Sequence, residues 1–136
     1  METERRRARV EVIEQMFEGA VGPAFDRADL ERILGDGHQI RVGRGFGPPK
    51  LLTQALEQAL EDAGIRMERG TAKTDVEGAV ALLVASGRVE LLREVNAMGQ
   101  LLGSALGPDL QLVAGGVVDS SRIAGLGVTL WIRPAT

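Results

Sequence analysis

The sequence predicts an α+β fold: a four-stranded sheet with two helices packed on one face, preceded by a long N-terminal helix and a short helix. Two kinds of pattern predict the elements. Four segments repeat apolar residues every three or four positions, as amphipathic helices do. Four others alternate apolar and polar residues or are apolar throughout, as strands are. The order is helix, short helix, strand, helix, strand, helix, strand, strand, and a single sheet covered by helices is the economical way to bury these stripes.

Composition limits what the chain can be. With 136 residues, 44% of them apolar and 26% charged, it can fold around one hydrophobic core. It has no cysteine and a single histidine, which excludes disulfides, thiolate chemistry and zinc sites built on cysteines or histidine pairs. The N-terminus lacks the apolar stretch of a signal peptide, and the longest apolar run, residues 79–85, is far shorter than the ~20 residues needed to cross a bilayer. We therefore expect a cytoplasmic protein without a membrane span.

The charge balance argues against nucleic acid as a partner. The formal net charge is −3, whereas binding to phosphates needs an excess of Lys and Arg. The single basic cluster, Arg5, Arg6, Arg7 and Arg9, is interpreted as the solvated start of a helix.

Two helices are expected in the N-terminal third. The first covers residues 3–20, and the second is short, starting after Asp26 and ending at Gly35. The inward residues of the first are Val10, Ile13, Met16, Phe17 and Ala20. Those of the second are Leu30, Ile33 and Leu34.

The middle of the chain predicts a strand, a turn and a helix. Residues 38–42 alternate and predict a strand with one solvated side, and the glycine-rich residues 43–47 predict a turn. Pro48-Pro49 suits the first turn of a helix, which Gly64 ends. Its stripe is Leu52, Leu56, Ala59, Leu60 and Ala63. Residues 66–75 have no clear period and predict a polar loop.

The last part predicts a buried strand, a long helix and two further strands. Residues 79–85 are apolar on both faces of a strand. The helix follows Ser86-Gly87 and ends at Gly107-Pro108, with Gly99 and Gly103 expected to let it lie close to the sheet. Its inward residues are Leu91, Leu92, Val95, Met98, Leu102 and Ala105. The closing strands are 110–119 and 126–133.

One segment has the appearance of a phosphate-binding loop, but its spacing is wrong. In Gly43-Arg44-Gly45-Phe46-Gly47 the pattern G-x-G-x-x-G would need glycine where Pro48 stands. The P-loop pattern needs Lys followed by Ser or Thr after a glycine, whereas Lys50 follows two prolines. A structural turn is the better interpretation.

Asp26 and Asp29 are the candidate functional carboxylates. Asp26 suits the N-cap of the short helix and Asp29 its third position, and the positive helix end keeps both ionised. An ionised carboxylate can orient a water, so helix capping and catalysis are compatible interpretations. Trp131 also has two interpretations, either under the leading helix or in a partner surface.

Six segments, in order, resemble the C-terminal domain of FtsZ, the tubulin-like cell-division GTPase. Residues 22–29 resemble the synergy loop N-x-D-x-x-D, and residues 33–47 resemble the helix-to-strand connection M-x-x-G-x-A-L-M-G-I-G. Residues 81–87 resemble A-L-V-N-I-T-G, and residues 92–96 resemble F-E-V-N. Residues 114–119 resemble F-G-A-V-I-D, and residues 127–132 resemble R-V-T-V-I-A. The resemblance covers residues 9–134. It implies that residues 1–20 are a remnant of the central connecting helix and 21–136 an FtsZ C-terminal-like domain.

The resemblance also implies a partner and a mechanism. In that family the synergy loop enters the nucleotide pocket of the next subunit and positions the water that attacks GTP. Asp26 and Asp29 would carry this role on a partner's GTP, with Phe25, Arg27 and Trp131 at the interface. Ala24 replaces the family asparagine. The glycine-rich G-G-G-T-G-[ST] loop of the GTP-binding half is not in this sequence, so the chain is expected to bind no GTP and no other cofactor alone and to be no enzyme on its own.

Three functions remain open from the sequence. The first is an interaction domain that docks on an FtsZ- or tubulin-like GTP-binding subunit. The second is a small α+β ligand-binding or enzyme domain with pockets between the subunits of a ring. The third is a structural paralogue that self-associates through the sheet face carrying Trp131, Arg41 and Arg133.

Overall fold

The computed structural model describes most of the chain from Arg27 onward. The described residues are Ile13 and residues 27–34, 40–48, 51–73, 75–86, 88–107, 109–119 and 125–135. Of the expected leading helix, residues 3–20, only Ile13 lies among them, and it is helical and buried. The division at residue 20 therefore stays a prediction.

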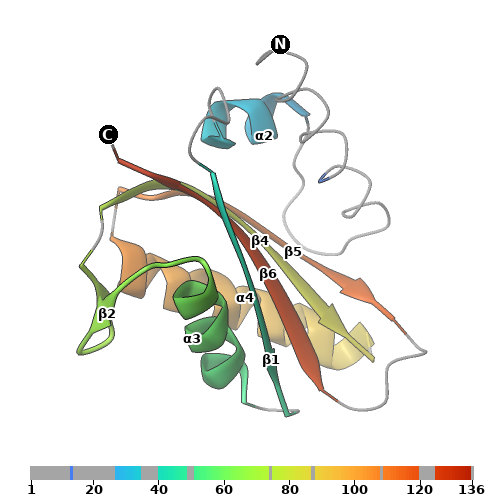
Figure 1. Ribbon diagram of the computed structural model, residues 1–136. Coiled ribbons are helices and arrows are strands. Elements are labelled where there is room, and N and C mark those ends of the chain that lie inside the picture. The colour runs from blue at the N-terminus through green and yellow to red at the C-terminus, as the bar shows by residue number, and fades with distance from the viewer. Residues whose placement is uncertain are drawn as a thin grey trace.

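The described part of the chain contains both helices and strands (Figure 1). The elements are α2 (Arg27–Leu34), β1 (Arg41–Gly47), α3 (Leu52–Asp62), β2 (Met67–Glu68), β3 (Thr71–Ala72), β4 (Val76–Ala85), α4 (Arg88–Leu106), β5 (Gln111–Val118) and β6 (Leu126–Pro134). The four long strands form one sheet in the order β1-β6-β4-β5, which confirms the predicted four-stranded sheet. β4 and β5 are parallel, while β6 runs antiparallel to both of its neighbours.

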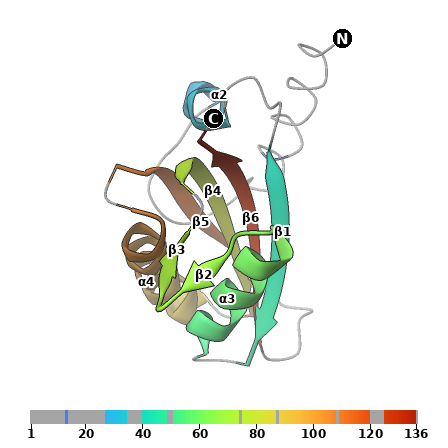
Figure 2. The same cartoon turned by 60° about the vertical axis from the view of Figure 1, so that its left-hand side comes forward.

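The larger hydrophobic cluster joins α3 and α4 to one face of the sheet. Alternate residues of β4, Ala79, Ala81 and Leu83, are fully buried in this cluster, because successive strand residues point to opposite faces. The helix residues that meet them include the predicted stripe of α3 and the predicted Leu91, Val95, Met98 and Leu102 of α4, with the predicted Ala105 packed against the cluster. The side chain of Leu92, also predicted to face inward, lies outside the described part of the structure. Figure 2 shows α3 and α4 side by side along the sheet.

The smaller cluster lies on the opposite face, where α2 packs. It contains the predicted inward residues of α2, with Ile13, Val80, Leu82 and Trp131. Both figures place α2 near the end of the sheet where β1 begins and β6 ends. Strand β4 is therefore covered on both sides, as its uninterrupted apolar run predicts.

The prediction of a turn at residues 43–47 was wrong. These residues are strand β1, which runs from Arg41 to Gly47. The glycines face α3: a Cβ atom on Gly43 would lie 2.0 Å from the carbonyl oxygen of Ala59, and one on Gly45 would lie 1.9 Å from that of Ala55. Glycine stands here because a helix backbone lies directly against the strand.

The prediction of a polar loop over residues 66–75 was also wrong. Strands β2 and β3 pair antiparallel, with Met67 opposite Ala72 and Glu68 opposite Thr71. The two residues between them, Arg69 and Gly70, have φ values of 53° and 79°. Positive φ at both central positions is the signature of a type I′ turn, whose twist suits a two-residue hairpin.

The predicted helix start at Pro48-Pro49 was also wrong, because Pro48 and Leu51 are not helical and α3 begins at Leu52. The other boundaries differ little from those predicted. β4 begins three residues before residue 79, and β6 ends one residue beyond 133. One expectation about α4 was wrong, since a Cβ atom on Gly99 or Gly103 would meet nothing within 4 Å. These two glycines do not serve a close approach of α4 to the sheet.

Candidate functional site

Helix α2 carries the one predicted carboxylate that the structure describes. Asp29 lies in the first turn, and its Oδ1 accepts a hydrogen bond from Nη2 of Arg32 at 3.3 Å. The acidic first turn and the basic last turn both complement the helix dipole. The side chain of Asp29 is 35% exposed, so solvent or a partner can reach it.

The other residues of the predicted acidic turn are not placed. Ala24, Phe25 and Asp26 lie outside the described residues, and of Arg27 only its helical backbone is described. The pairing of Asp26 with Asp29, and the interface role of Phe25 and Arg27, therefore stay predictions.

Burial of its apolar face fixes α2 on the sheet. Leu30, Ile33 and Leu34 are at most 1% exposed, and Ile33 contacts the backbone of β4 at Gly78, where a Cβ atom would lie 2.5 Å from the Ile33 carbonyl oxygen. Each fully buried side chain of this size contributes roughly 1.5–3 kcal/mol. Asp29 therefore lies on a helix whose position is fixed by its buried apolar side chains.

Trp131 lies inside the molecule. It is 6% exposed and belongs to the cluster beneath α2, with Val80 and Leu82 beside it on the sheet. Of the two positions that the sequence left open, this is the interior one. A partner surface containing Trp131 would need that side chain to be uncovered.

The glycine-rich segment is not built to bind an anion. Within β1, the Arg44 N–H donates to Oδ2 of Asp62 at 2.8 Å, and the Phe46 N–H donates to Oε1 of Gln58 at 3.1 Å. A phosphate loop needs free N–H groups, and here two are occupied and one acceptor is a carboxylate. The sequence missed Gln58 and Asp62, and their only signal is a spacing of four along the solvated side of α3.

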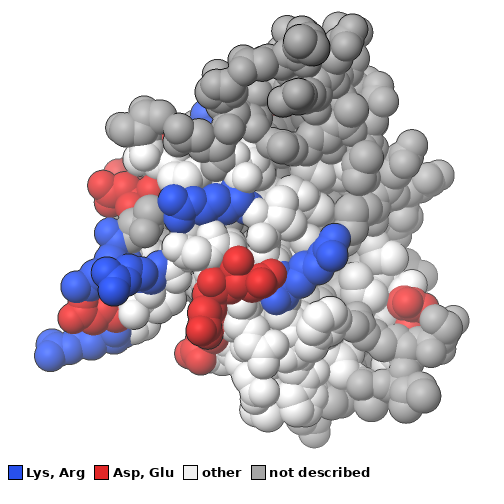
Figure 3. All heavy atoms as spheres, viewed as in Figure 1, with Lys and Arg blue, Asp and Glu red and all other residues white. Residues whose placement is uncertain are grey.

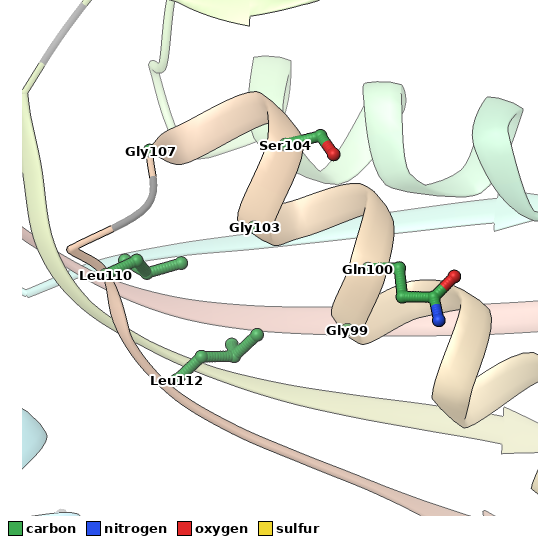
Figure 4. A pocket seen from close by; sticks show the side chains of 7 residues that line it. All are labelled: Gly99, Gln100, Gly103, Ser104, Gly107, Leu110 and Leu112. Carbon is green, nitrogen blue, oxygen red and sulfur yellow. The ribbon is translucent and has the colours of Figure 1, made fainter.

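Two open grooves lie on the described surface. One, of about 540 Å³, is lined by α4 and the start of β5. Figure 4 shows Leu110 and Leu112 on one side and Gly99 and Gly103 on the other. The second, of about 480 Å³, is lined by residues 57, 61, 64–67 and 70, next to the β2–β3 hairpin. Among their described lining residues, neither groove has a buried polar side chain that would select a ligand.

Charge is mixed on the face shown in Figure 3. Basic and acidic side chains lie together at the side where Figure 1 places the β2–β3 hairpin. In the hairpin, Lys73 pairs with Glu68, while Arg66 and Arg69 are exposed. The described residues on this face therefore form no single-sign patch of the kind that binds a nucleic-acid backbone.

The described residues also limit metal and membrane sites. No group of three or more His, Cys, Asp or Glu among them could hold a metal ion. Within the same residues, no helix is long and apolar enough to cross a membrane.

Comparison with protein-family models and with curated proteins finds no match. Solved structures do match. An FtsZ dimer from M. jannaschii, in its empty form, is 17% identical with a TM-score of 0.63, over 83% of this chain and 32% of that one. A tryptophan-to-tyrosine mutant of FtsZ from the same organism is 18% identical with a TM-score of 0.66, over 81% and 32%.

TubZ from Bacillus thuringiensis serovar israelensis, solved as GDP-form protofilaments, is similar over a longer stretch. It is 11% identical with a TM-score of 0.53, over 93% of this chain and 34% of that one. The chain thus spans about one third of the length of each structure it matches. Its fold is that of a corresponding third of the FtsZ and TubZ chains, consistent with the C-terminal-domain-like part that the sequence motifs indicated.

Proposed function

We propose that this chain is an interaction domain of the FtsZ/tubulin-like cytoskeleton. It docks on the nucleotide face of a GTP-binding tubulin-like subunit and presents its acidic turn, Asp26 and Asp29, to the GTP held there. The observation that carries the proposal is the location of Asp29, in the first turn of a helix fixed on an FtsZ-like sheet.

The matching structures support an assembly role. One is described as an FtsZ dimer and another as TubZ protofilaments. Both structures contain contacts between like chains, and this chain has the fold of one third of such a chain. Docking on a subunit of the same kind is the most direct function of that fold.

In this proposal the two chains have different tasks. The partner binds GTP and supplies the groups that hold its phosphates, while this chain supplies only carboxylates that orient the attacking water. It has no GTPase activity and binds no cofactor by itself, and it acts in the cytoplasm. Because Ala24 stands in place of the family asparagine, we expect a weaker effect on hydrolysis than a complete synergy loop would have.

The test is GTP turnover by the full-length FtsZ-like protein of the same organism, titrated with this chain. Turnover is expected to change well below equal stoichiometry, because a chain without a GTP site ends a filament. The variant D26N/D29N keeps residues that can cap a helix but removes both charges. We expect D26N/D29N to bind the partner as before. It should no longer change the rate at which each partner subunit bound to it hydrolyses GTP.

The matched control is E57Q/E61Q, which removes two exposed charges from α3. It should behave like the unaltered chain. No change in turnover up to equal stoichiometry would remove the docking proposal for that partner. Equal effects of D26N/D29N and the unaltered chain would leave docking in place and remove the role of the carboxylates.

A further inference from the structure

The outer edge of the sheet at β1 is occupied by side chains of α3. Among the described strands, β1 has β6 on one side only, and alternate residues of such an edge strand turn their N–H groups away from the sheet. Arg44 and Phe46 are two of these residues. Their N–H groups donate to Asp62 and Gln58, at 2.8 Å and 3.1 Å, instead of to another strand.

The spacing of the two hydrogen-bonded pairs explains how side chains of a helix can accept from successive outward N–H groups of a strand. Four residues of α-helix rise about 6 Å, and two residues of strand rise about 6.6 Å. Gln58 and Asp62 are four apart on α3, and Phe46 and Arg44 are two apart on β1. Because α3 returns antiparallel to β1, the first acceptor of the helix meets the later residue of the strand.

Two further features belong to the same edge. The glycines of β1 bring α3 against the strand, so that the short side chains of Gln58 and Asp62 reach its N–H groups. The residue that follows at the same spacing is Pro48, which has no N–H to offer. The close approach of α3 and the proline at position 48 each reduce the number of β1 N–H groups that another strand could use.

We propose that Gln58 and Asp62 close the β1 edge against strand addition by a second copy of this chain. The β1 sequence suits such pairing. Two antiparallel β1 strands centred on Arg44 would set the exposed Val42 of each opposite the exposed Phe46 of the other, an apolar pair on each side. The two Arg44 side chains would face each other at the centre, where like charges weaken the pairing.

The experiment compares Q58A/D62A with a matched control, Q54A/E61A. The control makes the same kind of replacements at exposed positions of α3 whose side chains have no hydrogen bond to β1 among the described residues. Sedimentation equilibrium over a wide concentration range measures mass, and amide hydrogen exchange at low concentration measures protection. In Q58A/D62A, we expect the Arg44 and Phe46 amides to exchange about tenfold faster than in the unaltered chain. We also expect the mass of this variant to rise toward twice that of the unaltered chain as its concentration increases.

A third variant tests whether the association uses this edge. R44P in the Q58A/D62A background removes the central donor, and proline is tolerated at an outward-facing position of an edge strand. We expect it to restore the mass of the unaltered chain. Association that survives R44P, or a Q58A/D62A chain whose mass never departs from that of the unaltered protein, would overturn the proposal.

The single variants keep the test decisive if Q58A/D62A does not fold. D62A should speed exchange of the Arg44 amide alone, and Q58A that of the Phe46 amide alone. D62N retains an acceptor oxygen and should leave the Arg44 amide protected. Unchanged protection in both alanine variants would show that the two side chains do not hold the edge.

Discussion

Glycine is used in two opposite ways in this chain. Gly43 and Gly45 face backbone atoms of α3, where a Cβ atom would lie about 2 Å from a carbonyl oxygen. Gly99 on α4 faces open space, and so does Gly103. The first pair is required by packing inside the molecule. The second pair only reduces the helix propensity of α4.

Substituting one glycine of each kind should change stability in opposite directions. Gly45→Ala forces the backbones of β1 and α3 apart, and we expect it to lower the free energy of unfolding by about 3 kcal/mol. Gly99→Ala adds a methyl group in open space and should raise it by about 1 kcal/mol. Urea unfolding followed by circular dichroism measures both values, and a stabilised Gly45→Ala would contradict the close packing of α3 on β1.

At the scale of elements, the β2–β3 hairpin shows how backbone strain locates a turn. Arg69 is the one non-glycine residue with positive φ in the described part of the chain, at 53°. This conformation costs roughly 1–2 kcal/mol for a residue with a Cβ atom, and Asn and Gly are the residues that tolerate it. The hairpin therefore has a suboptimal residue at its first turn position.

Arg69→Asn should stabilise the hairpin. It changes Arg69-Gly70 to the Asn-Gly pair that a type I′ turn prefers, and we expect a gain of about 0.5–1 kcal/mol, measured as a higher melting temperature. Arg66→Asn is the control, because it removes the same charge from an exposed position just before β2. An equal gain from both variants would attribute the effect to charge and not to the turn.

At the scale of the whole molecule, the sheet separates two hydrophobic clusters. α3 and α4 share the larger one, and α2 holds the smaller one, which contains Trp131. Since the sequence has a single tryptophan, its fluorescence reports the α2 side alone. This makes the docking of α2, the helix that carries Asp29, directly measurable.

Shortening a residue of α2 should change that signal. Ile33→Ala removes a side chain that is 1% exposed, so we expect a loss of about 2–5 kcal/mol and a red shift of tryptophan emission in the folded protein. Leu60→Ala, in the larger cluster, should destabilise to a similar extent without the red shift. A red shift from Leu60→Ala alone would contradict the separation of the clusters.

The same fluorescence tests self-association through the face that carries Trp131. Because this side chain is covered within one chain, its emission should not change as the protein concentration rises. A concentration-dependent blue shift would indicate that a second copy covers it further, and would favour the self-associating paralogue over the docking domain.

Several elements could be predicted from the sequence because their signal is local. The stripe of α3, the inward residues of α2 and the uninterrupted apolar run of β4 each repeat with the period of their own element. Burial then follows from the period, and the structure confirms these residues as core. The acidic first turn of α2 was predictable for the same reason, since helix termini favour acidic residues.

The glycines of β1 and the hairpin at residues 66–75 could not be predicted in this way. Glycine in a sequence is typical of a turn, and only the position of α3 against β1 makes it a strand residue. The closing of the β1 edge by Gln58 and Asp62, and the interior place of Trp131, likewise depend on elements far apart in the chain.

The sequence by itself determined the order and type of the main elements, the four-stranded sheet and the absence of cysteine chemistry. The tertiary structure alone decided which glycines face a neighbouring backbone, which N–H groups of the edge strand are satisfied by a helix, and that Trp131 is buried beneath α2. The physical reason is range. Periodicity and capping act within a few residues, whereas close packing and edge hydrogen bonds join residues that come together only when the chain has folded.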